Sequence, residues 1–295
     1  MPDRPKLAVI GLGTMGAPMA QHLQASGYQT LGVDPDPGAA DRFAGAVAPE
    51  VTDLSDADVI VTMLPEGRHV QEAYETTILP AAPPGAMLIE CSTIDVETAR
   101  SLNALATAKG FAQVDAPVSG GPEAAGNGGL SLMVGGTGQD VARARPVLQV
   151  LGSRITHFGA PGSGQAAKAC HNMICGITAM AVLEGFALAE AMGLDPAQFH
   201  RLCAGAAAQS WTLENRCPVP GVVPDAPASN GYAPGFAARL MAKDLRLAQA
   251  ASASSGQPTP FGAEAARVFT EFANATGGAL DFSSLYSELR KTGGT

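Results

Sequence analysis

The sequence predicts an α/β fold in which a doubly wound parallel sheet is followed by an all-helical domain. Short apolar runs alternate with helical patterns over the first half of the 295 residues, which is typical of a parallel sheet covered by helices. A glycine-rich loop follows the first apolar run directly. From Gln165 onward the apolar residues keep a helical period and no convincing strand is found.

Composition limits the class of protein. Hydrophobic residues make up 46% of the chain and charged residues 15%, which indicates a compact globular protein with room for two domains. The net charge of −9 gives no general attraction to nucleic acid or to anionic membranes. The five cysteines fit neither a metal site nor a secreted disulfide framework, and the N-terminal residues carry no signal-peptide core. We therefore expect a cytoplasmic protein with free thiols and no metal.

The elements follow in order along the chain. Candidate strands cover residues 7–10, 30–33, 59–63, 87–90, 113–115, 131–134 and 155–158. The glycine-rich segment 159–164 ends this pattern, and the sequence predicts domains of residues 1–163 and 164–295. A helix over 165–192 would be roughly 40 Å long, enough to link the two domains. Glu184 and Glu190 interrupt its apolar run, which favours a buried helix over a membrane span.

The loop after the first strand has the spacing of a phosphate-binding turn. It comprises Gly11, Leu12, Gly13, Thr14, Met15 and Gly16 and opens a helical pattern. The first glycine permits a tight turn, the second lets a pyrophosphate approach the backbone, and the third permits close helix packing. The helix N-terminus adds N–H groups and partial positive charge. Such a loop behind a strand and before a helix predicts a Rossmann-type dinucleotide site.

Asp34 ends the second apolar run, 18 residues after Gly16. A carboxylate there accepts hydrogen bonds from the adenosine ribose and repels a 2′-phosphate, which favours NAD over NADP. The next residues, Pro35-Asp-Pro37, carry no basic side chain. The alternative is that Asp34 only caps a turn.

Two further segments follow strands and should lie at the carboxyl edge of the sheet, where ligands of such sheets bind. Leu64 and Pro65 follow one strand, and Thr93 follows another. Thr93 is expected either to contact the cofactor near the nicotinamide or to cap the helix that starts near Asp95.

Hydride transfer from an alcohol requires a base for the hydroxyl proton, and Lys168 is the candidate. It lies in the first turns of the long helix, and Asn172 follows four residues later on the same face. Partial burial close to a helix N-terminus would lower the pKa of such a lysine, which suits acid/base work near neutral pH. The alternative, a solvated surface lysine, is less compatible with flanking residues that carry no charge until Glu184.

Another turn and a second lysine complete the candidate site. Ser119, Gly120 and Gly121 offer a hydroxyl and backbone N–H groups to a carboxylate, although the same residues would also make an ordinary turn. Lys243 lies on a helix of the other domain and is the second candidate lysine, and the alternative is a simple surface pair with Asp244.

These motifs together resemble the β-hydroxyacid dehydrogenase family over essentially the whole chain. They are Ile10-Gly-Leu-Gly-Thr-Met-Gly-Ala-Pro-Met19, Asp115-Ala-Pro-Val-Ser-Gly-Gly121, Gly164-Gln-Ala-Ala-Lys168 with Asn172, and Met241-Ala-Lys-Asp-Leu245. Ser92-Thr-Ile-Asp95, Cys217-Pro-Val-Pro-Gly-Val222 and the segment 240–249 are most similar to the 3-hydroxyisobutyrate dehydrogenases of valine breakdown.

The resemblance implies oxidation of 3-hydroxyisobutyrate to methylmalonate semialdehyde with NAD, in a homodimer or homotetramer. Lys168 would be the acid/base, Asn172 and Ser119 to Gly121 would orient the substrate, and Thr93 and Lys243 would lie near the cofactor. His171 departs from the usual asparagine and resembles 6-phosphogluconate dehydrogenase, whose helical region is much longer. Tartronate semialdehyde reductase or another short-chain 3-hydroxyacid dehydrogenase is the alternative enzyme, and a cofactor-sensing module the non-enzyme alternative.

Overall fold

The computed structural model describes residues 4–48 and 54–292. Contacts divide the chain into two compact units, Met1–Lys168 and Ala169–Thr295. This division falls inside the helix predicted over residues 165–192, after the boundary predicted at residue 163, and that boundary stays a prediction.

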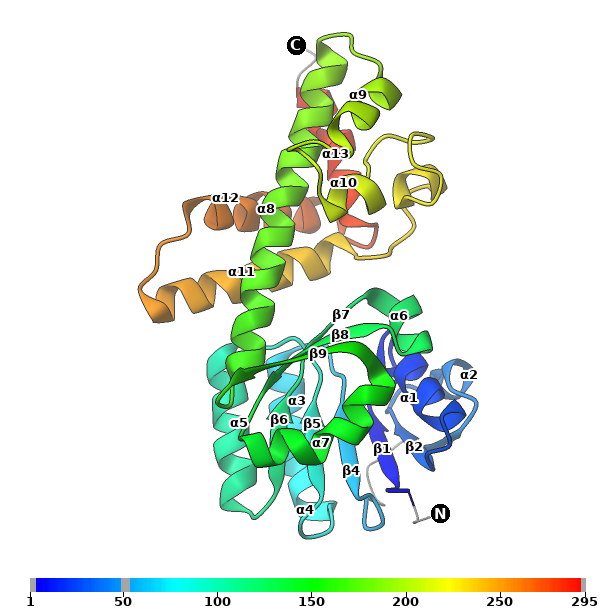
Figure 1. The fold of residues 1–295 in the computed structure, drawn as a ribbon, viewed down its shortest axis with the longest axis vertical. Coiled ribbons are helices and arrows are strands. Elements are labelled where there is room, and N and C mark those ends of the chain that lie inside the picture. The colour runs from blue at the N-terminus through cyan, green and yellow to red at the C-terminus, as the bar shows by residue number, and fades with distance from the viewer. Residues whose placement is uncertain (1–3, 49–53, 293–295) are drawn as a thin grey trace. The chain divides into compact units, whose positions relative to one another are not determined.

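The first unit is built on a mixed, mostly parallel sheet (Figure 1). Its strand order is β3-β2-β1-β4-β5-β6-β8-β7, with β9 paired to β8. The strands are β1 (Leu7–Ile10), β2 (Thr30–Val33), β3 (Ala46–Ala48), β4 (Val59–Thr62), β5 (Met87–Glu90), β6 (Ala112–Asp115), β7 (Val118–Ser119), β8 (Leu130–Gly135) and β9 (Gly152–Gly159). Strands β1 to β6 pair in parallel, whereas β8 runs antiparallel to β6 and β7 and parallel to β9. The predicted parallel α/β sheet is confirmed, with two short strands, β3 and β7, that the sequence prediction lacked.

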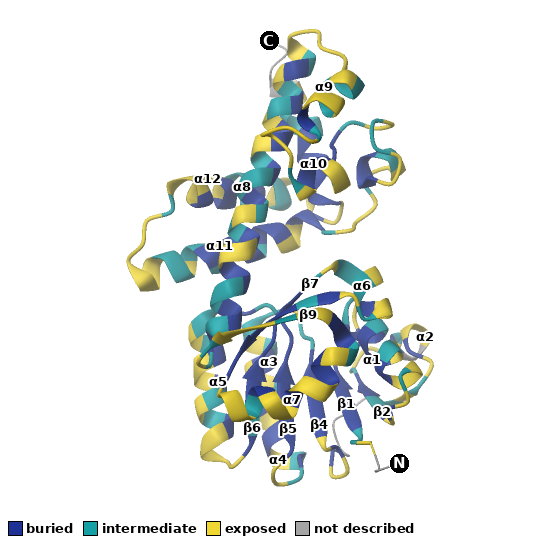
Figure 2. Ribbon diagram, viewed as in Figure 1, coloured by how far each residue is buried: buried dark blue, intermediate teal, exposed yellow. Residues whose placement is uncertain are grey.

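Alternation along the strands sends side chains into two separate cores. Leu7 and Val9 of β1 face one core, and Ala8 and Ile10 face the other. Because both faces are covered, the central strands β1, β4 and β5 are buried at every position, as their dark ribbons in Figure 2 show, whereas β3 and β9 are partly exposed. The sheet is therefore doubly wound.

Helices form the two outer layers of this unit (Figure 1). One layer contains α1 (Gly16–Ala25), α6 (Gly121–Asn127) and α7 (Gly138–Leu151). The other contains α3 (Gly67–Ala73), the π-helix η1 (Tyr74–Ile78), α4 (Leu79–Ala81) and α5 (Val96–Ala108). The short helix α2 (Ala39–Arg42) follows β2.

The regular elements in the described part of the second unit are all helices, joined by loops, apart from one isolated bridge between Ala237 and Asp281. It contains most of α8 (Ser163–Ala191), then α9 (Pro196–Cys203), α10 (Trp211–Asn215), η2 (Pro227–Asn230), α11 (Ala238–Ser255), α12 (Pro260–Thr276), η3 (Phe282–Leu285) and α13 (Tyr286–Thr292). Helices α11 and α12 pack side by side, and their core contains Met241, Leu245, Phe269 and Phe282. The all-helical second half predicted from the sequence is thus confirmed.

Helix α8 is the single helix among the described residues that is long and apolar enough to cross a membrane. Core helices of water-soluble proteins meet the same criterion, and α8 contributes Ala179, Leu183 and Phe186 to the core of the helical unit. Near its end, Glu190 accepts a hydrogen bond of 2.5 Å from the Tyr286 hydroxyl and pairs with Arg290 at 2.6 Å. Its last turns are thereby joined to α13.

Candidate active site

The glycine loop joins β1 to α1 with the geometry expected of a phosphate-binding turn. Gly11 has φ of +94°, and a Cβ atom there would lie 2.3 Å from the Met63 carbonyl oxygen. A Cβ atom on Gly16 would lie 1.8 Å from the Gly11 carbonyl oxygen, whereas one on Gly13 would meet nothing within 4 Å. Gly11 and Gly16 are thus required by the packing of the folded chain, independently of any ligand. Gly13 and Thr14 are exposed, which leaves the open side of the loop to a ligand.

Asp34 lies at the carboxyl end of β2 beside this loop. Its carboxylate accepts hydrogen bonds from the backbone N–H of Leu12 at 2.7 Å and of Asp36 at 2.9 Å. It therefore both joins the loop to β2 and stands where a ribose would lie.

Arg42 also reaches this corner, although the sequence analysis did not include it. Helix α2 carries it back, so that Nε donates to the Leu12 carbonyl oxygen at 2.8 Å and Nη2 pairs with Asp36 at 2.8 Å. The Gly38 N–H and the Arg42 guanidinium lower the pKa of Asp36. The guanidinium lies close to the ribose corner but is held by an acidic partner.

Leu64, Pro65 and Thr93 follow β4 and β5 at the carboxyl edge, as predicted. The Leu64 N–H donates to Ser92 Oγ at 2.8 Å, which ties the two strand ends together. Asp95 is the N-cap of α5 and accepts from the Thr98 N–H at 2.8 Å. The capping role that the sequence left open for Thr93 therefore belongs to Asp95.

Lys168 is buried, with 7% of its surface exposed, and its Nζ donates to the Val118 carbonyl oxygen at 2.8 Å. The alternative of a solvated surface lysine is thus wrong. Val118 opens strand β7, and the next residue is Ser119, so the ammonium group is held at the start of the predicted substrate loop.

The substrate loop itself has a conformation that requires glycine. Gly120 has φ of +140° and Gly121 has φ of +75°, and helix α6 begins at Gly121. Ser119 is partly exposed at the end of β7. Lys168 and the loop from Ser119 to Gly121 are therefore neighbours in one compact unit, as the chemistry proposed from the sequence requires.

In the helical unit, Asn172 and Asp244 are buried and take part in a polar cluster that the sequence did not predict. Its Nδ2 donates to Asp244 Oδ2 at 2.5 Å, and its Oδ1 lies 2.8 Å from His171 Nδ1. Lys243 Nζ lies 3.4 Å from Asp244 Oδ1, and only 16% of its side chain is exposed. The Lys243–Asp244 pair is thus largely buried, and the alternative of a simple surface pair is wrong.

Three polar residues lie in register at the carboxyl ends of the adjacent strands β4, β5 and β6. In the sheet register Thr62 pairs with Glu90, and Glu90 with Asp115, and all three are buried. Burial raises the pKa of Glu90 to about 8, against hydrogen bonds from Ser92 that lower it. Burial also raises the pKa of Asp115. From the sequence, Glu90 and Asp115 were predicted to end strands and Asp115 to begin the substrate-loop motif, and none of the three was predicted to have a role in the site.

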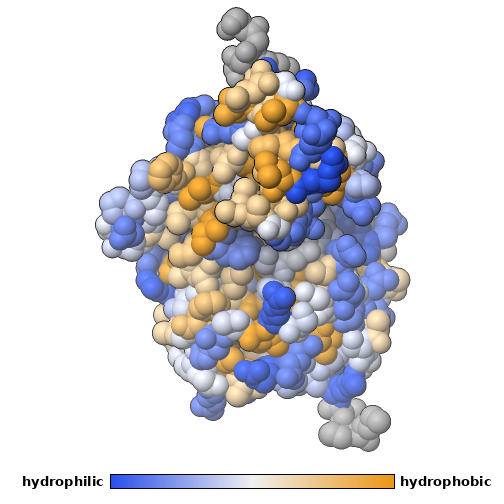
Figure 3. Space-filling model, turned by 45° about the horizontal axis from the view of Figure 1, so that its top comes forward, coloured by the Kyte–Doolittle hydropathy of each residue, from blue (hydrophilic) through white to orange (hydrophobic). Residues whose placement is uncertain are grey.

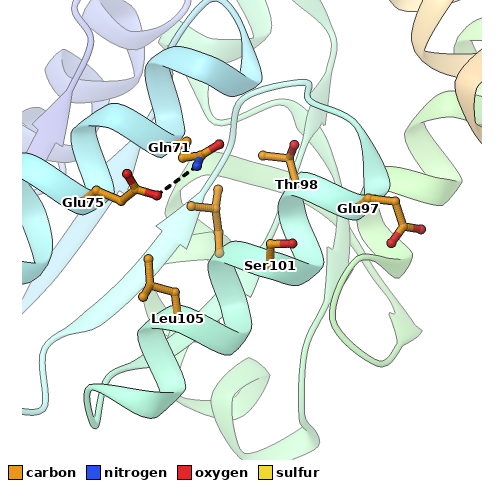
Figure 4. A pocket seen from close by; sticks show the side chains of 7 residues that line it. Gln71, Glu75, Glu97, Thr98, Ser101 and Leu105 are labelled. Carbon is orange, nitrogen blue, oxygen red and sulfur yellow. Dashed lines mark hydrogen bonds between the residues drawn. The ribbon is translucent and has the colours of Figure 1, made fainter.

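A cavity elsewhere in the first unit does not belong to this site (Figure 4). It lies between the α3–η1 helices and α5 and is lined by Gln71, Glu75, Glu97, Thr98, Ser101, Leu102 and Leu105. None of the residues predicted for cofactor, substrate or catalysis lines it. Among residues 4–48 and 54–292, no group of His, Cys, Asp and Glu is arranged to hold a metal ion.

The residues at the switch point fit a dinucleotide. The strand order reverses between β1, which pairs with β2, and β4, and ligands of doubly wound sheets bind at such a point. The open position at Gly13 would admit a pyrophosphate, and Asp34 stands at the end of β2 for the ribose.

Comparison with known proteins gives the family. A family model described as the NAD-binding domain of 6-phosphogluconate dehydrogenase matches residues 6–159. One described as NAD-binding of NADP-dependent 3-hydroxyisobutyrate dehydrogenase matches residues 162–289. A probable 3-hydroxyisobutyrate dehydrogenase of Mycobacterium tuberculosis is 44% identical over 96% of this chain and 97% of its own. The chain belongs to the 3-hydroxyisobutyrate dehydrogenase family. The resemblance inferred from the motifs is thereby confirmed.

Other members of the 3-hydroxyisobutyrate dehydrogenase family agree. The 3-hydroxyisobutyrate dehydrogenase of Pseudomonas aeruginosa is 42% identical over 96% of this chain and 98% of its own. The solved structure of the Mycobacterium tuberculosis 3-hydroxyisobutyrate dehydrogenase with L-serine has a TM-score of 0.91 at 43% identity, covering 97% of this chain and 99% of that one. An NAD-dependent L-serine dehydrogenase of Pseudomonas aeruginosa is 40% identical over 90% of this chain and 91% of its own. The chain is therefore a dehydrogenase that uses a nicotinamide dinucleotide, and the alternative of a sensing module is not retained.

Proposed function

We propose that this protein oxidises 3-hydroxyisobutyrate to methylmalonate semialdehyde with NAD, a step of valine breakdown, and that Lys168 is its acid/base. The observation that carries the proposal is the buried Nζ of Lys168, held at 2.8 Å by the Val118 carbonyl beside the substrate loop. A buried amine next to a carboxylate-binding turn suits an alcohol that bears a carboxylate two carbons away.

The protein residues divide the work of the reaction. The nicotinamide, when bound, accepts the hydride that leaves the alcohol carbon. Lys168 in its neutral form takes the hydroxyl proton at Nζ and returns it in the reverse direction. Ser119, Gly120 and Gly121 hold the substrate carboxylate. Asn172 uses one Nδ2 proton for Asp244 and has a second one for the substrate, while Lys243 is proposed to contact both cofactor and substrate.

The preference for NAD over NADP is proposed from the charges around the ribose corner. Asp34 and Asp36 are both acidic, and the guanidinium of Arg42 is paired with Asp36 at 2.8 Å. A 2′-phosphate would therefore meet one carboxylate directly and a guanidinium that is already neutralised. Leu12, Thr14, Met15, Leu64, Pro65 and Thr93 are proposed to line the remainder of the cofactor site.

L-Serine is a second candidate substrate. One relative is named an NAD-dependent L-serine dehydrogenase, and the similar solved structure is named with L-serine. Both compounds carry a primary hydroxyl β to a carboxylate. Initial rates on 3-hydroxyisobutyrate, L-serine, glycerate and tartronate semialdehyde, each with both cofactors, test the assignment. It fails if another compound has a higher kcat/KM than 3-hydroxyisobutyrate.

A homodimer or homotetramer in the cytoplasm is also proposed. The helical unit exposes large apolar side chains, including Ile174, Leu188, Met192, Leu202 and Trp211. Figure 3 shows hydrophobic surface, coloured orange, in the upper part of the view. Apolar surface of this kind is typical of an interface between subunits. Sedimentation of the purified protein at micromolar concentration would contradict the proposal if it shows a monomer.

A further inference from the structure

A buried polar network joins the beginning of helix α8 to the ends of the central strands. Gln165 is 1% exposed, and its side-chain amide bonds in three directions. Its Nε2 donates to Glu90 Oε2 at 3.1 Å and to the Ser92 carbonyl oxygen at 2.7 Å, and its Oε1 accepts from the Ile94 N–H at 3.1 Å. Glutamine can make these bonds because its side-chain amide has two N–H donors and one carbonyl acceptor. Glutamate and methionine, which are of similar length, cannot make all three.

The backbone of the same turn is bound to the neighbouring strand. Asp115 Oδ1 accepts from the Gly162 N–H at 2.8 Å, and Oδ2 accepts from the Gln165 N–H at 2.9 Å. The carboxylate of β6 thus satisfies N–H groups that the start of a helix leaves without partners.

The helix start also lies directly against the sheet backbone. A Cβ atom on Gly164 would lie 2.3 Å from the Met133 carbonyl oxygen, and one on Gly135 would lie 2.8 Å from the Gly164 nitrogen. The side-chain network and this backbone contact hold the same turn from different directions. Lys168 is three residues after Gln165, one turn along the helix.

We propose that Gln165, acting through Glu90, is a positioning residue that fixes the height of Lys168 above the substrate loop. The inference rests on the proposed role of Lys168 as acid/base. Glu90 accepts from the Ser92 N–H at Oε1 and from Gln165 Nε2 at Oε2, and a protonated carboxyl keeps both bonds because each of its oxygens retains a lone pair. Other titratable groups that act on this region are Asp115, which raises the pKa of Glu90, and the buried Tyr74 and Cys91.

The test compares Gln165→Leu with Gln113→Leu. Gln113 is equally buried on β6, but its amide oxygen accepts from Asn103 of α5 at 2.7 Å, and so it controls for the loss of a buried amide in the same unit. We expect kcat to fall about 10- to 100-fold in the first variant and less than about threefold in the second. The Kd for NADH should stay within about threefold in both. The pH at which kcat reaches half its limiting value should shift only in Gln165→Leu.

Two further measurements keep the inference testable. Amide hydrogen exchange of residues 162–166 should speed up in Gln165→Leu but not in Gln113→Leu. The isosteric Glu90→Gln replaces one carboxyl oxygen with an NH₂ group, which cannot accept from Ser92 or Gln165. It should therefore lower kcat, as Gln165→Leu does, but without creating a cavity.

Equal loss of kcat in Gln165→Leu and Gln113→Leu, or unchanged exchange at residues 162–166, overturns the inference. If Gln165→Leu does not fold, an unaltered kcat and pH profile in Glu90→Gln overturns it. If Lys168→Ala retains turnover while Gln165→Leu exchanges faster, the proposed role of Lys168 as acid/base fails. The finding that Gln165 holds the start of α8 then still stands.

Discussion

Replacing Gly13 with alanine separates what the glycine loop does for the ligand from what it does for the protein. A Cβ atom on Gly13 meets nothing within 4 Å, so the folded chain has room for it. Gly16→Ala is the matched change on the same loop. Its Cβ atom would lie 1.8 Å from the Gly11 carbonyl oxygen, and ordinary contact requires that gap to open by about 1.6 Å.

The two variants are expected to fail in different assays. Gly13→Ala forces a bound pyrophosphate away from the loop, and the loss of one charge-assisted hydrogen bond of about 1.5–3 kcal/mol raises the Kd for NADH about 10- to 100-fold. Its stability should be unchanged or higher by about 0.4–1 kcal/mol. Gly16→Ala separates α1 from β1, and overpacking of this kind costs about 1–3 kcal/mol, which lowers Tm by roughly 2–10 °C.

Both quantities are measured on the same purified proteins, Kd by NADH fluorescence and Tm by thermal unfolding without ligand. The reasoning is refuted if Gly13→Ala binds NADH as tightly as the parent protein. It is also refuted if Gly13→Ala loses as much stability as Gly16→Ala, because the loop would then not be open at that position.

Three other predictions follow from the site. Lys168→Ala should lower kcat about 10²- to 10⁴-fold while NADH binding is kept, and near-normal single-turnover rates would show that the base lies elsewhere. Joint replacement of Asp34 and Asp36 by serine should free Arg42 and lower the Kd for NADPH at least about tenfold in calorimetry, and adding Arg42→Ala should reverse the gain. The raised pKa of Glu90 means that the folded state holds a proton that the unfolded state releases, so stability present below about pH 4.5 is lost as pH rises toward 8. Glu90→Gln should flatten this dependence of Tm between pH 5 and 8, and an unchanged slope would assign it to another group.

Much of the fold could be predicted because its signals are local. A doubly wound sheet buries both faces of its strands, and the resulting apolar runs identified β1, β2, β4 and β5 within one residue. Strands β3 and β7 were missed because runs of three and two residues carry no period, and they exist only because a neighbouring strand offers hydrogen bonds. The domain boundary at residue 163 remains a prediction.

The candidate site was predictable only where chemistry and backbone geometry coincide in a short motif. Gly11, Gly13 and Gly16 could be assigned separate roles in advance because each role is a local steric demand. Arg42 pairs with Asp36, and Asn172 bonds to Asp244, only because the tertiary fold brings their elements together. No local sequence pattern specifies these contacts. The catalytic and binding roles of the predicted residues stay predictions until the variants are measured.

The contact between Gly135 and Gly164 has a consequence for how new activities could arise in this protein. The two backbones approach each other with no side chain between them, so a substitution at either glycine cannot adjust the position of the amine by a small step. Laboratory selection for a new alcohol should therefore leave both glycines unchanged and collect its substitutions around residues 119–121 and in the helical unit. The same fixed position of the Lys168 amine can then serve many alcohols. Substrates can differ without any change in the proton transfer.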